Sequence, residues 1–220
     1  KQALKIKPDY AEAYYNMGNS LRVKGDPEAA IESYKQALKI KPDYAQVYNN
    51  MGNALKDKND LEAAIECYNQ ALKVKPDDAE AYNNMGVVLK EMNDLDASID
   101  RYEKALKIKP DYAEAYNNMG IALNYMGDSE TAIDCYTKAL KIKPNYTAAY
   151  RNMAASMYAN GDLSGSIATY KKALKIEPNS VQVWNNLGFP LQAIKLKGHS
   201  VEELLSTFTP QEDSKHFQIA

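Results

Sequence analysis

Asparagine recurs at one position every 34 residues along this chain, and we call this set the first column. Its members are Asn16, Asn50, Asn84, Asn118, Asn152 and Asn186. A carboxamide carries both a donor and an acceptor, so it can pair with a peptide group whatever side chain the peptide bears. A row of such side chains therefore has the chemistry to hold an extended polypeptide by its backbone.

A second set of polar side chains lies one residue before the first column, and we call it the second column. It contains Asn49, Asn83, Asn117 and Asn185, with Tyr15 and Arg151 at the other two positions. Asparagine is a mediocre helix former, so its recurrence inside predicted helices needs a reason. We predict that both columns bind peptide and that Asn19 and Asn53 extend them at the N-terminal end. The alternative is that the asparagines hydrogen-bond to one another or to nearby backbone and join successive repeats.

The residue types needed for catalysis do not gather anywhere in the sequence. Both histidines, His199 and His216, lie near the C-terminus, and no Cys/His cluster has the spacing of a metal site. There is no glycine-rich phosphate loop, and no Ser/His/Asp set stands out from the repeated pattern. We therefore predict that this segment is not an enzyme and that it holds no metal or cofactor.

The elements that carry the two columns follow from the strict 34-residue period, which six prolines also mark. They are Pro8, Pro42, Pro76, Pro110, Pro144 and Pro178. A period of this length predicts a stacked array of helical repeats rather than a globule with a central active site. In each repeat the apolar spacing predicts a first helix, with Tyr14, Gly18 and Leu21 on one face. A second helix then packs residues such as Tyr34 and Ala37 against it.

The order of residues within each 34-residue unit resembles the tetratricopeptide repeat: an aromatic residue, Met-Gly, Leu, Ala, Tyr, Ala and Pro. The resemblance covers residues 11–180 as five full repeats, with residues 1–10 as the end of a truncated preceding repeat. It implies an all-α fold, a right-handed α-solenoid superhelix of antiparallel helix pairs, with the asparagines on the flank that lines its concave groove. The columns are also similar to the asparagine ladder in the repeat domain of O-linked N-acetylglucosamine transferase. That similarity implies that they hold extended polypeptide with little sequence preference.

Side chains suited to helix ends recur with the same period. Five aspartates that precede the second helices are predicted N-caps, namely Asp26, Asp60, Asp94, Asp128 and Asp162. Capping boxes are predicted before the first helices, as Asp9 with Glu12, Asp43 with Gln46, Asp77 with Glu80, and Asp111 with Glu114. Paired lysines such as Lys39 and Lys41 end the second helices, where they complement the helix dipole.

The repeat pattern degrades after Gly188. Pro190 falls inside the first helix of the sixth repeat, which predicts a kink or an end of that helix. We expect residues 181–208 to form a degenerate sixth repeat with C-terminal capping helices, including a short amphipathic helix over residues 201–208. Residues 209–220 are polar and are expected to form a flexible tail.

Composition narrows the class of partner. The chain has 27 basic and 29 acidic residues and a net charge of −2, so it offers no field that favours nucleic acid. No apolar run approaches the roughly 18 residues that a membrane helix needs, so we predict no membrane insertion. Cys67 and Cys135 lie two repeats apart, and unpaired cysteines suit a reducing compartment. We therefore predict an intracellular, cytoplasmic location.

These observations predict a protein–protein interaction module that binds protein or peptide in extended conformation. Two alternatives stay open. The chain starts inside a repeat without an initiating Met, so we expect a longer protein, in which it could be the substrate-recruiting arm of a glycosyltransferase or sulfotransferase. Alternatively, Ala3, Leu4 and Ile6 leave an apolar end through which the repeats self-associate as a homo-oligomeric scaffold.

Overall fold

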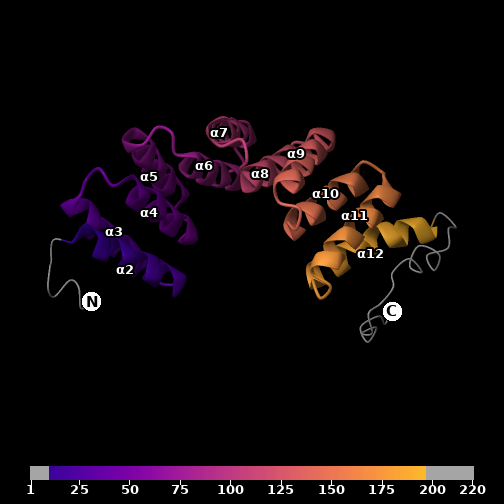
Figure 1. Cartoon of the computed structure of the whole chain (residues 1–220), viewed down its shortest axis with the longest axis horizontal. Coiled ribbons are helices and arrows are strands. Elements are labelled where there is room, and N and C mark those ends of the chain that lie inside the picture. Colours follow the sequence, from indigo (N-terminus) through magenta and orange to yellow (C-terminus); the bar gives the residue numbers. More distant parts are fainter. Residues whose placement is uncertain (1–9, 197–220) are drawn as a thin grey trace. The chain divides into compact units, whose positions relative to one another are not determined.

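The computed structural model describes residues 10–196, and these residues form α-helices joined by short turns (Figure 1). They fall into two compact units, one that ends at Met126 and one that begins at Gly127. The predictions for the truncated repeat at the N-terminus, for the helix over 201–208 and for the tail over 209–220 lie outside the described residues.

Helices of two lengths alternate along the chain. The first helix of each full repeat has 13 residues: α2 (Ala11–Val23), α4 (Ala45–Asp57), α6 (Ala79–Glu91), α8 (Ala113–Tyr125) and α10 (Thr147–Ala159). The second helix has 14 residues: α3 (Pro27–Ile40), α5 (Leu61–Val74), α7 (Leu95–Ile108), α9 (Ser129–Ile142) and α11 (Leu163–Ile176). A longer helix, α12 (Val181–Leu196), follows. The predicted all-α fold of paired helices is confirmed.

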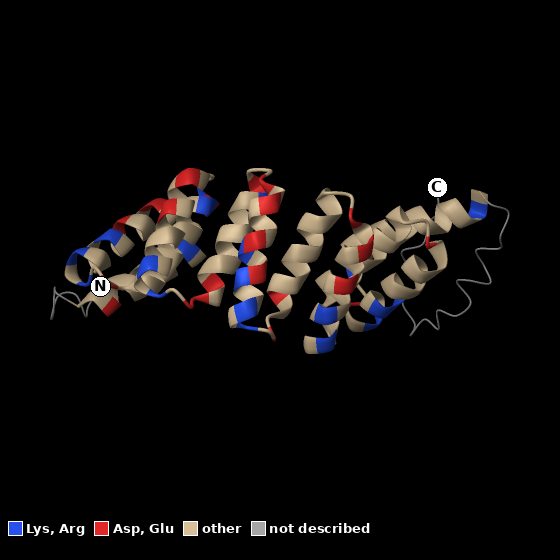
Figure 2. Cartoon of the chain, turned by 90° about the horizontal axis from the view of Figure 1, so that it is seen from above, with Lys and Arg blue, Asp and Glu red and all other residues tan. Residues whose placement is uncertain are grey.

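Each second helix begins after an aspartate, as predicted. In all five, Oδ1 of the aspartate accepts a hydrogen bond from the backbone N–H three residues on, at 2.8–3.4 Å. The residue before this cap has a positive φ, 81° at Gly25 and 63° at Asn59, a conformation that glycine and asparagine tolerate best. In α7, Asp96 lies in the first turn and Lys107 in the last, which complements the helix dipole. Figure 2 shows acidic and basic residues of both signs among the helices.

The first helices begin one residue later than predicted. Tyr44 is the N-cap of α4 and makes no side-chain capping bond, and Tyr112 and Tyr146 hold the same place before α8 and α10. Lys41 Nζ lies 4.6 Å from the centre of the Tyr44 ring, a cation–π contact that orders this turn. Before α6 the tyrosine is replaced by Asp78, which does cap the helix.

The capping boxes predicted at three of these turns are therefore wrong. They began at Asp43, Asp77 and Asp111. The turn after the proline takes one more residue than the prediction allowed, so these aspartates stand outside the N-cap position. The fourth predicted box begins at Asp9, outside the described residues.

The contact between paired helices is made by glycine on the first helix and tyrosine on the second. Tyr34, Tyr68 and Tyr102 are fully buried. A Cβ atom placed on Gly18 would lie 2.4 Å from Cε1 of Tyr34, and the equivalent distance at Gly86 is 2.6 Å to Tyr102. No side chain fits there without movement. The predicted packing of Tyr34 on the second helix against the face of the first helix that carries Gly18 is confirmed.

The last described helix continues through proline. The sequence predicted a kink or an end at Pro190. α12 runs on to Leu196, so the helix does not end there, and the kink stays a prediction. Proline inside a helix costs about 3 kcal/mol, whereas burial of one large apolar side chain contributes about 1.5–3 kcal/mol. Leu187, Leu191 and Ile194 all join the buried cluster formed with α11, which outweighs the cost. Among helices α2 to α12, none is both long and apolar enough to cross a bilayer.

Candidate functional site

The two asparagine columns differ in how much of each side chain the solvent reaches. In the second column Asn49, Asn83 and Asn117 are buried, each with no more than 5% of its surface exposed, whereas Asn185 is exposed. In the first column Asn16 is exposed, and the other five members, Asn50, Asn84, Asn118, Asn152 and Asn186, are half-buried. The first column is therefore the one that a ligand can reach directly.

A ladder of hydrogen bonds joins the columns of successive repeats in the first unit. Each first-column amide nitrogen donates to the second-column residue of the preceding repeat, 35 positions earlier. The bonds run from Asn50 Nδ2 to Tyr15 OH at 3.2 Å, from Asn84 Nδ2 to Asn49 Oδ1 at 3.2 Å, and from Asn118 Nδ2 to Asn83 Oδ1 at 3.0 Å. Asparagine-to-asparagine bonding is the arrangement that the joining alternative describes, so the columns connect repeats. Binding of peptide by the same residues stays a prediction.

The second-column side chains use their donors as well. Asn49 Nδ2 donates to Glu80 Oε1 at 3.3 Å, and Asn83 Nδ2 donates to Asn84 Oδ1 at 3.4 Å. In the second unit Arg151 bonds to Gln182 and to Oδ1 of Asn152. With both ends of its amide engaged and little exposure, a residue such as Asn49 positions its neighbours rather than contacting a ligand.

The first column keeps unused acceptors. Oδ1 of Asn50 and Oδ1 of Asn118 accept no hydrogen bond from any described residue, although the nitrogen of each amide is held by the preceding repeat. The anchored nitrogen fixes the orientation of each amide. Asn50 Nδ2 donates to both Tyr15 OH and Asn19 Oδ1, so both of its N–H groups are used, whereas Asn118 Nδ2 donates only to Asn83 among the described residues and keeps its second N–H. Both asparagines therefore present a preoriented acceptor on the face formed by the first helices, and Asn118 also presents a donor.

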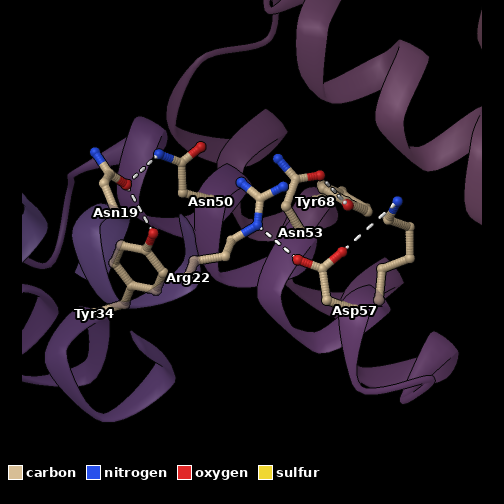
Figure 3. Close-up of polar contacts among 8 residues, drawn as sticks. Asn19, Arg22, Tyr34, Asn50, Asn53, Asp57 and Tyr68 are labelled. Carbon is tan, nitrogen blue, oxygen red and sulfur yellow. Dashed lines mark hydrogen bonds and ion pairs between the residues drawn. The ribbon is translucent and has the colours of Figure 1, made fainter. Parts of the chain in front are cut away.

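Two further asparagines accept hydrogen bonds from buried tyrosines (Figure 3). Tyr34 OH donates to Asn19 Oδ1 at 2.7 Å, and Tyr68 OH donates to Asn53 Oδ1 at 2.8 Å. Burial raises the pKa of Tyr34 to about 12, so its hydroxyl remains a donor at neutral pH. Because the oxygen atoms face the tyrosines, the amide nitrogens of Asn19 and Asn53 point away from them, and no described residue accepts from these nitrogens.

The third repeat lacks this acceptor. Val87 stands where Asn19 and Asn53 stand in the first two repeats, and the buried hydroxyl of Tyr102 finds no hydrogen-bond partner among the described residues. A buried polar group without a partner costs about 1–3 kcal/mol. The row formed by Asn19 and Asn53 is therefore confined to α2 and α4, whereas the first column continues on α6 and α8.

An ion pair that sequence reasoning did not predict lies beside these amides. Arg22 Nε donates to Asp57 Oδ2 at 2.8 Å, and Lys56 Nζ lies 4.0 Å from Oδ1 of the same carboxylate. The two terminal nitrogens of Arg22 donate no hydrogen bond to a described residue. The signal for this pair was present in the sequence, because Arg22 and Asp57 are 35 residues apart, the same separation that relates the two columns.

The sequence and the structure were also compared with known proteins. Family models described as TPR repeat match residues 18–58, 52–93 and 156–195, and models described as tetratricopeptide repeat match residues 1–32 and 77–145. No curated protein matches the sequence significantly.

Solved structures with the same fold include three repeat proteins of similar length. MamA is 29% identical with a TM-score of 0.66, over 75% of this chain and 96% of that one. YrrB is 20% identical with a TM-score of 0.62, over 84% and 95% of the two chains. PilF of Pseudomonas aeruginosa is 19% identical with a TM-score of 0.70, over 90% and 97%. The family models together span well over half of the sequence, and the chain therefore belongs to the tetratricopeptide repeat family.

Proposed function

We propose that this interaction module binds an extended polypeptide across the face formed by the first helices of the first unit, through the first asparagine column. The observation that carries the proposal is the unused, preoriented Oδ1 of Asn50 and Asn118. The Oδ1 of each can accept from a peptide N–H, and the remaining N–H of Asn118 can also donate to a peptide C=O. The second column supports this arrangement by holding the first column in place.

The spacing of the first helices suits an extended chain. α2, α4, α6 and α8 each contact the next one in order. Helices in contact lie about 8–10 Å apart, and an extended chain advances about 3.3 Å per residue. Each repeat would therefore meet roughly every third residue of the ligand. Contacts at that interval would be made to the backbone of the ligand and would leave the side chains between them free. The face would then bind peptides of many different sequences.

Solved relatives support the class of ligand. YrrB is described as a TPR protein with an unusual peptide-binding site. Its identity to this chain is 20%, so it supports the use of this fold for peptide binding and leaves the binding residues to be argued from this chain alone.

The test compares backbone recognition with side-chain recognition. A labelled mixed-sequence peptide pool is titrated against the native chain and against the triple variant Asn50→Ala, Asn84→Ala, Asn118→Ala. Each lost hydrogen bond costs about 0.5–1.5 kcal/mol, so binding should weaken at least about tenfold. The matched control is Asn69→Ala, because Asn69 is an exposed asparagine on the second helix α5.

A second arm uses peptides whose backbone nitrogens are methylated at every third position. These peptides keep their side chains but lose N–H donors, so we expect them to bind more weakly than the parent peptides. Circular dichroism and melting establish that the triple variant stays folded. Unchanged binding by a folded triple variant, or full binding of the methylated peptides, would refute the proposal that the first column hydrogen-bonds to the backbone of the ligand.

A further inference from the structure

We infer that the part of this face on α2 and α4 is a carboxylate site, and that the bound polypeptide places an Asp or Glu side chain against the terminal nitrogens of Arg22. The inference rests on the proposed function, because it assigns a chemical preference to one end of the same ligand. It is carried by three observations: the fixed orientation of Arg22, a local excess of donors, and the confinement of both to the first two repeats.

Arg22 is oriented by its neighbour while its binding edge stays open. The bond from Nε to Asp57 Oδ2, at 2.8 Å, restrains the guanidinium plane. Nη1 and Nη2 form the other edge of that plane, and neither donates to a described residue. Two parallel N–H groups match the two oxygens of a carboxylate. Asp57 therefore fixes the orientation of Arg22, while the N–H groups on Nη1 and Nη2 make no hydrogen bond to a described residue.

Most of the hydrogen-bonding groups around Arg22 that remain available are donors, because the nearby amide oxygens already accept hydrogen bonds. Oδ1 of Asn19 already accepts from Tyr34 OH and from Asn50 Nδ2, and Oδ1 of Asn53 accepts from Tyr68 OH. Their amide nitrogens remain, and Figure 3 shows the Arg22 guanidinium between the Asn50 and Asn53 side chains. The free acceptor in this patch is Oδ1 of Asn50. A ligand that satisfies the patch must bring acceptors.

Charge points the same way. Arg22 and Lys56 contribute two positive charges against the single negative charge of Asp57, which leaves the cluster with a net charge of +1. The side chains of Arg22 and Asp57 are 34% and 37% exposed, so the cluster is open to a ligand yet partly shielded from solvent. Partial shielding strengthens a charge-assisted hydrogen bond relative to one in water.

The next repeat does not continue the patch. Val87 replaces the amide of Asn53, and the position of Arg22 is lysine in both following repeats, at Lys56 and Lys90, so among α2, α4 and α6 the paired guanidinium donors occur on α2 alone. Lys90 Nζ instead lies 5.9 Å from the centre of the Tyr125 ring. Along this row the face thus changes from amide and guanidinium donors on α2 and α4 to valine on α6, while the first-column asparagines continue on α6 and α8. This change gives the ligand a direction: its acidic residue lies at the α2–α4 end.

The experiment is an aspartate scan of a neutral peptide. Peptides of nine residues, acetylated and amidated, carry Asp at one position each, and each is paired with a peptide that has Asn at the same position. Fluorescence anisotropy measures binding to the native chain, to Arg22→Gln and to Lys35→Gln. Lys35 is an exposed lysine on the second helix α3, so its change removes the same charge away from the face.

We expect Asp to tighten binding about tenfold over Asn at one or two adjacent positions, as charge-assisted bonds do. The gain should vanish in Arg22→Gln and persist in Lys35→Gln. A gain that is independent of position, that survives Arg22→Gln, or that falls equally in Lys35→Gln would overturn the inference. Neutral peptides with a free C-terminus are tested alongside. If they bind through Arg22 as tightly as the amidated Asp peptides, the carboxylate belongs to the chain end and the inference fails.

The outcomes also separate the two proposals. If the neutral Asn peptides bind and Asp adds nothing, backbone reading stands and the carboxylate site falls. If neutral peptides do not bind while Asp peptides bind through Arg22, backbone reading falls and the carboxylate site stands.

Discussion

The amide of Asn118 donates from Nδ2 to Oδ1 of Asn83 at 3.0 Å, across a separation of 35 residues. Asn83 is 5% exposed, so the acceptor lies inside the interface between two repeats. The same relationship joins Asn84 to Asn49. A buried residue therefore fixes the orientation of a more exposed one, and loss of the buried partner should act on stability first and on binding second.

Replacement of that buried partner is the direct check. Asn83→Ala leaves Asn118 Nδ2 without its acceptor and removes both bonds of the Asn83 amide. We expect a loss of about 1–3 kcal/mol in the free energy of unfolding, measured by urea denaturation. Asn69→Ala, at an exposed position of α5, should change it by less than about 0.5 kcal/mol. Equal effects of the two variants would contradict a structural role for the second column.

The missing acceptor in the third repeat can be restored. Val87→Asn places an amide where Asn53 stands in the preceding repeat, so Tyr102 OH should gain a partner. We expect the free energy of unfolding to rise by about 0.5–1.5 kcal/mol. The control is the same substitution in a Tyr102→Phe background, which has no hydroxyl to satisfy. If the gain is as large there, it does not come from the tyrosine.

The glycine column offers a matched pair of substitutions. Gly86→Ala places a Cβ atom 2.6 Å from the Tyr102 ring. We expect this overpacking to lower the free energy of unfolding by about 1–3 kcal/mol. Gly188 is exposed and has no described atom within 4 Å of an added Cβ. Gly188→Ala should therefore be neutral or stabilising by up to about 1 kcal/mol. Melting temperatures of the two variants test this expectation. If both variants lose equal stability, the contact with the Tyr102 ring is not the reason why glycine occupies position 86.

Alkaline pH should destabilise the fold through the buried tyrosines. The pKa of Tyr34 is about 12 in the folded chain, above its ordinary value of 10.0, because burial disfavours the phenolate. Below pH 10 the hydroxyl is protonated in both states, and its contribution to stability is complete. Between about pH 10 and 12 the unfolded chain ionises first, so stability falls as pH rises.

Denaturation midpoints at several alkaline pH values, for the native chain and for Tyr34→Phe, measure this effect. The variant should lose stability less steeply with pH, although it starts lower because it lacks the bond to Asn19. Identical slopes for the two proteins would show that Tyr34 does not titrate with folding.

Local rules predicted the elements that repeat most strictly. Asp26 and its equivalents cap the second helices, and a short side-chain acceptor just before a helix can be recognised directly in the sequence. Gly18 and Tyr34 meet because the apolar faces that carry them pair the two helices of the repeat. The first-helix caps were misplaced, because Asp43 looks like a cap by type while the backbone turns one residue further. Which asparagine column is buried could not be predicted, since helical spacing gives the direction of a side chain but not how closely the next repeat packs on it.

The constant separation of 35 residues in the ladder bears on how such a chain changes length. Each of these bonds joins only adjacent repeats, so an in-frame duplication or deletion of 34 residues within the ladder leaves each donor opposite a second-column acceptor, either an amide oxygen or the Tyr15 hydroxyl. Genetic expansion or contraction would therefore preserve the register of the interface without compensating substitutions. Selection for a longer or shorter ligand could then act on repeat number alone.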